Sequence, residues 1–303
     1  MTRTMSAGPP IVFIHLGPEL PPYMRDTVRQ ARTWNPSAEI VCIAEKAGAF
    51  EVGEKWILLS EIPPTEQYQR FKETCILDTG FRGGFWRFTT ERLFVLESWM
   101  TWCGLQECFH LENDNPMYFS LEQLLPQLRT KSPGLLAPIH GQGADSNSFR
   151  VCFSVLYVNS RESIGNMIYT LASAPSHIDE MERCGEYWLL NRDECGYLPA
   201  APPCTVLRRE DFRDGLIDTE YGLVFDAMLY GQYLGGVDPR NELPNGAPGY
   251  VNPDTEFTAD QFLYGWRADD EGRRYPVLMD HDGREWRIAN LHIHCKRVLD
   301  FMS

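Results

Sequence analysis

The sequence predicts an α/β fold with a mostly parallel central sheet and an elaborated C-terminal half. Short continuous apolar runs recur early, at residues 11–16, 40–44 and 56–59, as in the buried strands of parallel sheets. A segment with helical spacing, 23–34, separates the first two runs, and a further helical segment precedes a fourth run at Cys108–Leu111. Strands that alternate with helices in this way imply right-handed crossovers and a parallel sheet.

Residues that interrupt regular structure mark the ends of the first elements. The run at 11–16 stops at Gly17, and the helical segment 23–34 stops before Pro36, because proline and the residue before it disfavour a helix. The first half then continues with two expected helices, 66–77 and 88–100, on either side of a Gly-rich loop at 78–85.

The second half mixes strands and helices with turns. Asp282-Gly283 lies between apolar stretches and predicts a hairpin turn. The other expected elements are a strand at 150–158, helices at 160–172, 177–191 and 225–233, and a last apolar segment at 286–294. Because no repeat or clear linker divides the chain, we expect one domain over residues 1–303.

Composition and charge argue against several classes of protein. The 303 residues carry a formal net charge of −14, and a general nucleic-acid binder needs clustered Lys and Arg instead. No apolar run reaches the roughly 20 residues of a membrane span, and the first ten residues lack a signal-peptide core. The nine cysteines are irregularly spaced and form no CxxC pair, which favours free thiols in a reducing compartment. We therefore expect a cytoplasmic protein with no transmembrane segment and no nucleic-acid partner.

An acidic turn, ENDNP, follows the run at Cys108–Leu111. In open α/β sheets, ligands bind beyond the carboxyl ends of the strands. Residues two apart in an extended chain point to the same side, so Glu112 and Asp114 are candidate ligands for Mg²⁺ or Mn²⁺. From spacing alone, the alternative is an ordinary turn in which Asn and Asp serve the backbone.

Residues 290–296 read NLHIHCK. His292 and His294 alternate with apolar residues, so on a strand both imidazoles face one way and are candidate ligands for a transition metal. Lys296 is a candidate partner for a phosphate. The alternative is a pair of exposed histidines on a terminal edge.

Two further features have an ordinary explanation beside the functional one. The glycines of the 78–85 loop, with Arg82 and Arg87, are a candidate phosphate cradle, but they match neither GxGxxG nor a P-loop, and a flexible loop is the alternative. Asp226 and Asp179 each lie near the start of an expected helix, where a carboxylate stabilises the helix N-terminus without any catalytic role.

In this order, the motifs resemble those of the GT-A class of nucleotide-sugar glycosyltransferases. The resemblance lies in the N-terminal β-α-β unit, the arginine-bearing helix FTTERLFVLESWM, the strand ending in acid-x-acid, CFHLENDN, and the C-terminal His and Lys of NLHIHCK. The segments FDAMLYGQYLGGVDPRN and NLHIHCK also resemble sparsely characterised glycosyltransferase-like proteins of bacteria and large DNA viruses. The resemblance implies a GT-A-like (Rossmann-like) domain in which residues 11–119 bind the nucleotide and 120–303 hold the acceptor and a C-terminal metal-binding segment.

The resemblance also implies roles for single residues. The implied metal ligands are Glu112, Asp114, His292 and His294, with Mn²⁺ or Mg²⁺ as the cofactor. The implied contacts to the nucleotide sugar are His15, Gly17, Arg92, Glu112, Asn113 and Lys296. The candidate catalytic carboxylates are Asp226 and Asp179. The acidic motif is ExD where the family has DxD, so the contact that Glu112 makes, to ribose or to metal, stays open.

These motifs predict a metal-dependent glycosyltransferase that moves a sugar from a nucleoside-diphosphate sugar to a glycan or another hydroxyl acceptor. One alternative is a metal-dependent hydrolase or phosphatase, which needs a nucleophile or a second metal, with Asp78 and Asp145 as candidates. Another is a catalytically silent protein that binds nucleotide sugars. The first hypothesis requires the carboxylates at 112 and 114 and a histidine at 292 or 294 to meet within about 10 Å, because divalent ions bind oxygen at about 2–2.6 Å.

Overall fold

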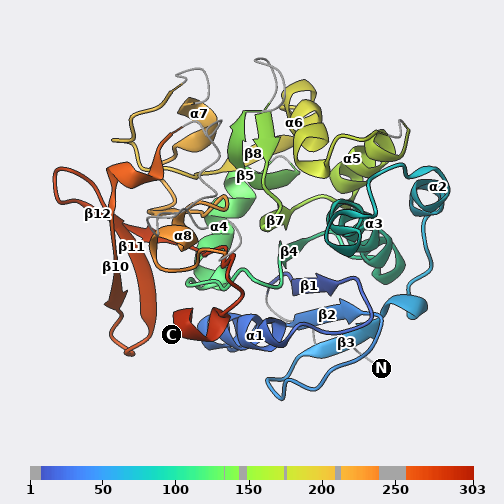
Figure 1. Ribbon diagram of the computed structural model, residues 1–303, viewed down its shortest axis with the longest axis horizontal. Coiled ribbons are helices and arrows are strands. Elements are labelled where there is room, and N and C mark those ends of the chain that lie inside the picture. The colour runs from blue at the N-terminus through green and yellow to red at the C-terminus, as the bar shows by residue number, and fades with distance from the viewer. Residues whose placement is uncertain (1–7, 133, 143–148, 174–175, 209–212, 239–256) are drawn as a thin grey trace.

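The central element of the fold is an eight-stranded sheet in the order β3-β2-β1-β4-β7-β5-β6, with β8 paired to β5 (Figure 1). Only β7 and β6 run against the other strands, so the sheet is mostly parallel and the predicted α/β fold class is confirmed. The structure is a computed structural model that describes residues 8–132, 134–142, 149–173, 176–208, 213–238 and 257–303.

The strands of the central sheet are β1 (Ile11–His15), β2 (Ile40–Ala44), β3 (Lys55–Leu58), β4 (Cys108–Leu111), β5 (Leu135–Gln142), β6 (Phe149–Val151), β7 (Val155–Val158) and β8 (Cys195–Leu198). The longer helices are α1 (Pro22–Trp34), α2 (Glu66–Thr74), α3 (Phe85–Cys103), α4 (Leu121–Lys131), α5 (Arg161–Ser173) and α6 (Glu180–Leu190). The short helical turns are η1 (Leu59–Glu61), η2 (Phe81–Gly83), α7 (Arg213–Leu216), α8 (Tyr230–Tyr233), η4 (Ala259–Gln261) and η5 (Val298–Phe301).

A second, four-stranded sheet has the order β10-β11-β12-β9 and lies at the opposite side of the molecule from α2 (Figure 1). Its strands are β9 (Leu223–Val224), β10 (Leu263–Ala268), β11 (Arg274–Met279) and β12 (Glu285–Ile288). The predicted hairpin turn at Asp282-Gly283 joins β11 to β12, and Gly283 supplies the positive φ of 78° that such a turn needs.

Helices cover both faces of the central sheet. Ile11 and Phe13 of β1 belong to the core formed with α1 and α4, whereas Val12 and Ile14 belong to the core formed with α2, α3, α5 and α6. All four side chains are at most 2% exposed. Burial on both faces explains why this strand is a continuous apolar run in the sequence.

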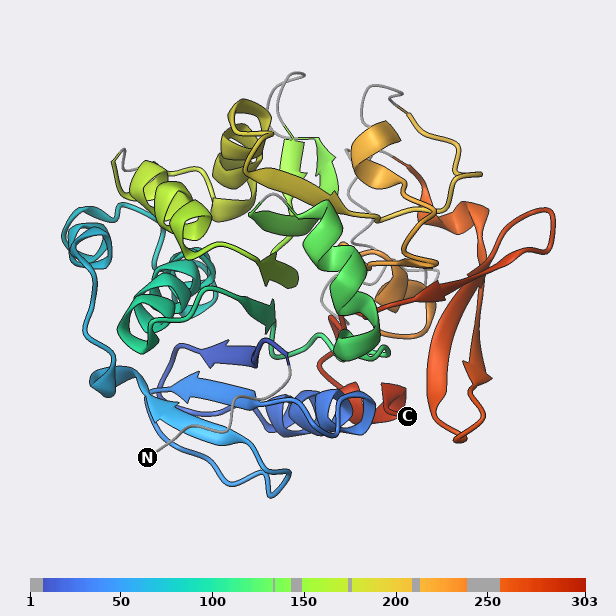
Figure 2. The same ribbon diagram turned by 180° about the vertical axis from the view of Figure 1, so that it is seen from behind.

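The C-terminal residues return to α1, beside which both views place them (Figures 1 and 2). The hydroxyl of Ser303 accepts hydrogen bonds from Gln30 at 2.7 Å and from the indole of Trp34 at 2.9 Å. This return carries the segment before η5 past the carboxyl ends of β1 and β4, where the candidate site lies.

Some element bounds differ from those predicted. The strand expected at 150–158 is two strands, β6 and β7, because a turn at 152–154 interrupts it. Both strands pair with β5, and β7 also pairs with β4. The helix expected at 225–233 contains only Tyr230–Tyr233. All nine cysteines are free thiols, as their spacing predicted. Among the helices of the described segments, none has the length and apolar character needed to cross a bilayer.

Candidate metal and nucleotide-sugar site

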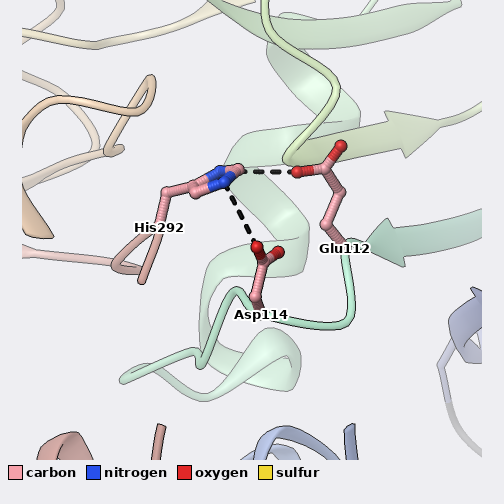
Figure 3. A group of neighbouring side chains, drawn as sticks. All are labelled: Glu112, Asp114 and His292. Atoms are coloured by element: carbon pink, nitrogen blue, oxygen red, sulfur yellow. Dashed lines mark ion pairs between the residues drawn. The ribbon is translucent and has the colours of Figure 1, made fainter. Parts of the chain in front are cut away.

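Three side chains with metal-ligating atoms converge beyond the carboxyl end of β4 (Figure 3). Glu112 and Asp114 follow β4 directly, and His292 comes from the C-terminal segment. The imidazole Nδ1 of His292 lies 3.4 Å from Oε2 of Glu112, and its Nε2 lies 3.4 Å from Oδ2 of Asp114. The structure therefore brings these three predicted residues well within the expected 10 Å.

Backbone pairing between two distant segments produces this convergence. The N–H of Leu291 donates to the carbonyl of Pro116 at 3.1 Å, and the N–H of Ile293 donates to the carbonyl of Asp114 at 3.0 Å. Both apolar side chains are fully buried. Because neighbouring side chains of an extended segment point to opposite sides, His292 is directed at the acidic turn.

His294 is placed differently from His292, although their rings are only 4.6 Å apart. Its Nε2 lies 3.1 Å from the carbonyl of Met228, which can only accept, so this nitrogen carries the proton. Burial and the neighbouring His292 lower the pKa of His294 to about 3. Of the two histidines between which the sequence could not choose, His292 is the one in the acidic group.

Two cations flank the acidic group. Arg92, on α3, donates from Nη2 to Oε1 of Glu112 at 2.5 Å, and the ammonium of Lys296 pairs with Asp114. Burial alone would raise the pKa of Asp114, but the charges of His292 and Lys296 outweigh it and hold that pKa well below the ordinary value. The carboxylate of Asp114 is therefore ionised and available to a cation.

The donor set of the group fits a divalent ion such as Mn²⁺ or Mg²⁺. One ligand atom from each of the three side chains lies within 4.8 Å of the others. Two ligands on opposite sides of an ion at about 2.0–2.6 Å are themselves about 4–5 Å apart, so small side-chain adjustments suffice. The Nδ1 of His292 is buried and has no hydrogen-bond partner, although buried nitrogens are normally paired. Two carboxylates with one imidazole suit Mn²⁺ better than they suit a thiolate-seeking metal.

The predicted nucleotide contacts lie at the carboxyl end of β1, beside this group. The amide of Asn113 donates to the carbonyl of Ile14 at 3.0 Å and lies 3.4 Å from Nδ1 of His15. Gly17 follows with a φ of 133°, and a Cβ there would lie 3.5 Å from the His15 ring. The acidic turn is thus tied to the end of β1, where an α/β sheet offers its ligand-binding edge.

Asp226 is buried and fully engaged with backbone groups. Its Oδ1 accepts from the N–H groups of Leu229 at 2.6 Å and Tyr230 at 2.8 Å, and its Oδ2 accepts from those of Gly231 and His292, both at 2.9 Å. Burial raises its pKa, and these backbone donors oppose that rise. Neither oxygen is free to act as a base, so the predicted catalytic role gives way to a positional one: Asp226 holds the backbone of His292.

Asp179 likewise has both oxygens engaged. It caps α6, accepting from the N–H of Glu182 at 3.1 Å, and pairs with Arg150 at 2.5 Å. Its neighbour Glu180 is 4% exposed and accepts from the hydroxyl of Thr89, on α3, at 2.9 Å. Burial first, and Asp179 second, raise the pKa of Glu180 to about 7.

The Gly-rich loop is an ordered turn in which neither arginine is directed at the metal group. Arg82 lies 3.7 Å from Asp238, and Arg87 lies 3.4 Å from Glu91. Asp78, a candidate nucleophile of the hydrolase alternative, accepts from two backbone N–H groups of this turn. Asp145, the other candidate, lies outside the described residues.

Sequence reasoning missed two residues of the site. Tyr23 opens α1 beyond the end of β1, and the ammonium of Lys296 lies 5.7 Å from its ring. Burial and then Asp114 raise the pKa of Tyr23 to about 12, so its hydroxyl stays protonated. The rule that ligands bind beyond the strand ends would have found it. Gly231 contacts the backbone of His292, and no local pattern signals that contact.

Comparisons with known proteins give matches only among solved structures. No protein-family model matches the chain, and no curated protein matches it. Mouse xyloside xylosyltransferase 1, in its apo form, is similar at 8% identity with a TM-score of 0.42, over 63% of this chain and 85% of that one. The apo form of the glycosyltransferase GlyE of Streptococcus pneumoniae is similar at 13% identity with a TM-score of 0.37, over 63% of this chain and only 44% of that one. A putative glucose-1-phosphate thymidylyltransferase from Bacillus anthracis is similar at 11% identity with a TM-score of 0.36.

Glycosyltransferases are among the solved structures to which this chain is similar. The narrower resemblance to bacterial and viral proteins stays a prediction. At these identities the likeness concerns the fold alone, and the chemistry has to be derived from the residues of this chain.

Proposed function

We propose that this protein is a divalent-metal-dependent glycosyltransferase that transfers a sugar from a nucleoside-diphosphate sugar to an acceptor hydroxyl. The observation that supports the proposal most is the group formed by Glu112, Asp114 and His292, with Arg92 and Lys296 on either side. A site with acidic metal ligands and flanking cations suits a diphosphate leaving group.

The chemistry of transfer explains why such a site is useful. The bond between the anomeric carbon and a diphosphate oxygen breaks, the electron pair stays on the diphosphate, and the acceptor oxygen forms the new bond. Mn²⁺ or Mg²⁺, held by Glu112, Asp114 and His292, would supply positive charge next to the departing diphosphate. Stabilisation of developing charge by fixed groups is commonly the largest single contribution to catalysis.

The chain's own residues would do the rest. Lys296, now paired with Asp114, would turn its ammonium toward the diphosphate. Arg92 would keep Glu112 in place and present its guanidinium edge to the donor sugar. His15 and Asn113 would border the nucleotide at the end of β1. In this proposal residues 11–119 hold the donor, and 120–303 supply the acceptor side and the C-terminal metal ligand.

Neither Asp226 nor Asp179 is assigned as a base, because their carboxylate oxygens already accept backbone N–H groups or pair with Arg150. The proposal therefore passes the acceptor proton to an oxygen of the departing diphosphate, which gains negative charge as the anomeric bond breaks. Among the described residues, no contact specifically favours either alternative, a hydrolase or a catalytically silent binding protein.

Thermal unfolding of the full chain with UDP, GDP or dTDP, each with and without MnCl₂, tests the proposal. We expect one nucleotide to raise the melting temperature only with Mn²⁺, because ligands that bind the folded state stabilise it. Asp114→Asn should abolish the shift. Asp282→Asn is the matched control, since its carboxylate is 77% exposed on the β11–β12 turn.

The donor reaction is measured by NMR, as release of the nucleoside diphosphate from the corresponding nucleotide sugar. Release with Mn²⁺ by the wild type, and its absence in Asp114→Asn, supports the proposal. A chain that responds to no nucleotide in the presence of Mn²⁺, or an Asp114→Asn variant that keeps the full response, refutes it.

A further inference from the structure

An exposed group of aromatic rings surrounds the start of α3. Phe81, Phe85 and Phe88 are 42%, 39% and 37% exposed. Phe81 stacks on Trp86, with ring centroids 5.8 Å apart and planes at 16°, and Phe85 meets the edge of Trp86 at 5.0 Å. We call Phe81, Phe85, Trp86 and Phe88 the aromatic turn. Large apolar side chains gathered at the surface mark interaction sites.

Two rings of the aromatic turn, those of Phe85 and Phe88, lie on the face of α3 that carries Arg92. Phe88 is four residues and Phe85 seven residues before Arg92 on α3, so all three side chains share one face of the helix. The guanidinium of Arg92 contacts Glu112. Since each helical residue rises about 1.5 Å, the exposed rings begin about 6 Å along the axis from Arg92.

A second link ties the turn to the C-terminal metal segment. Arg82, within the turn, lies 3.7 Å from the buried carboxylate of Asp238. Two residues before Asp238, the carbonyl of Gly236 accepts from the N–H of Cys295 at 3.0 Å. Cys295 precedes Lys296, so the segment 236–238 contacts both Arg82 and the backbone beside Lys296.

The backbone of the turn is built to hold this arrangement. Arg82, Gly83 and Gly84 have φ values of 46°, 68° and 97°, and a left-handed arginine is costly unless its surroundings enforce it. The carboxylate of Asp78 accepts from the N–H groups of Gly80 at 2.7 Å and Phe81 at 3.2 Å. The rings are therefore presented by a fixed turn.

We infer that the aromatic turn binds a sugar ring of the acceptor, so that the acceptor is a carbohydrate. This inference rests on the proposed function, because it gives the site its second substrate. A pyranose has an apolar C–H face, which matches a flat aromatic ring, and hydroxyls at its edge. Arg82 and Arg87, each with a side chain that is 37% exposed, lie beside the rings and can donate to such hydroxyls. An alkyl chain has no hydroxyl to accept a hydrogen bond from either guanidinium group.

Saturation-transfer NMR on the full chain, without donor or metal, tests the inference. The probes are the methyl α- and β-hexopyranosides, lactose, maltose and cellobiose, with hexanoate as an alkyl probe and trialanine as a peptide probe. We expect the ring C–H protons of at least one carbohydrate to receive saturation. Phe85→Ala/Phe88→Ala should weaken that binding by about tenfold, as two aromatic contacts are lost. Trp102→Ala is the matched control: it is 48% exposed at the other end of α3.

The possible results separate this inference from the proposed function. Carbohydrate binding that Phe85→Ala/Phe88→Ala loses and Trp102→Ala keeps supports the inference, whether or not nucleotides bind. Saturation of hexanoate or trialanine alone, no carbohydrate signal, or a carbohydrate signal that survives in the double variant overturns it. The donor site is tested separately by the rise in melting temperature that a nucleotide causes in the presence of Mn²⁺. We expect this rise to be the same in the double variant and the wild type.

Discussion

Replacing Gly231 with alanine tests whether the backbone beneath His292 sets the metal site. Gly231 lies in α8, where its N–H donates to Asp226. A Cβ at this position would lie 2.3 Å from the carbonyl oxygen and 3.0 Å from the carbonyl carbon of His292, where ordinary contact begins at 3.4 Å. The His292 backbone would therefore have to move by roughly 1 Å, which is enough to take a ligand out of a coordination sphere with about 0.2 Å of tolerance.

The expected magnitudes follow from that displacement. Overpacking of this kind costs about 1–3 kcal/mol in the free energy of unfolding. We expect the Kd for Mn²⁺ to rise roughly ten- to a hundredfold, the usual range when groups that orient a ligand are disturbed. Urea unfolding measures the first quantity and isothermal titration with MnCl₂ measures the second.

Gly165→Ala provides the control for this substitution. Gly165 lies in α5, and an added Cβ there meets nothing within 4 Å. Alanine is the better helix former, so this variant should gain roughly 0.5–1 kcal/mol and keep its Mn²⁺ affinity. A Gly231→Ala variant with wild-type Mn²⁺ affinity would show that the close approach to His292 does not position the ligand.

Four other substitutions have expected outcomes. His292→Ala should abolish the Mn²⁺-dependent nucleotide shift and His294→Ala should keep it, because only the first ring contacts the carboxylates; the reverse result in thermal unfolding would contradict the assignment. Glu180 has a folded-state pKa of about 7, above its unfolded value, so its stabilising contribution is complete below about pH 4.5 and is lost as pH rises through 7. Between pH 5 and pH 8, the free energy of unfolding measured with urea should therefore fall less for Glu180→Gln than for the wild type. An equal fall in both proteins would contradict the raised pKa of Glu180. Asn35→Ala should lower the free energy of unfolding by about 1–3 kcal/mol, since it leaves the buried N–H of Leu121 without its acceptor at 2.6 Å; an unchanged urea midpoint would refute this.

Local patterns were enough for the elements that bury a regular stripe of apolar residues. The buried runs at β1 and β2 and the helical spacing of α1 are visible in the sequence because each reflects contacts that repeat along one element. The run at 150–158 hid the interruption at 152–154 because Cys152, Phe153 and Ser154 are as buried as the strands on either side.

The site could be predicted in its residue types but not in its contacts. Glu112, Asp114 and His292 were named from their positions after a strand and on an alternating segment. The choice between His292 and His294 depends on the carbonyl of Met228, which no pattern reveals. The engagement of Asp226 was hidden for a similar reason: its carboxylate accepts from four backbone N–H groups, three in the turn at 229–231 and one at His292, and residue spacing reveals none of these contacts.

The origin of the ligands in the chain has a consequence for folding. Asp114 and Lys296 are 182 residues apart, and their pairing closes a loop that contains much of the central sheet and the whole of the second sheet. The entropy of closing so long a loop means that this contact forms late, after the intervening strands have paired. During synthesis the two carboxylates would leave the ribosome long before the histidine does. Metal affinity would then appear only once the C-terminal segment has docked, and a chain cut before residue 292 would lack the histidine ligand.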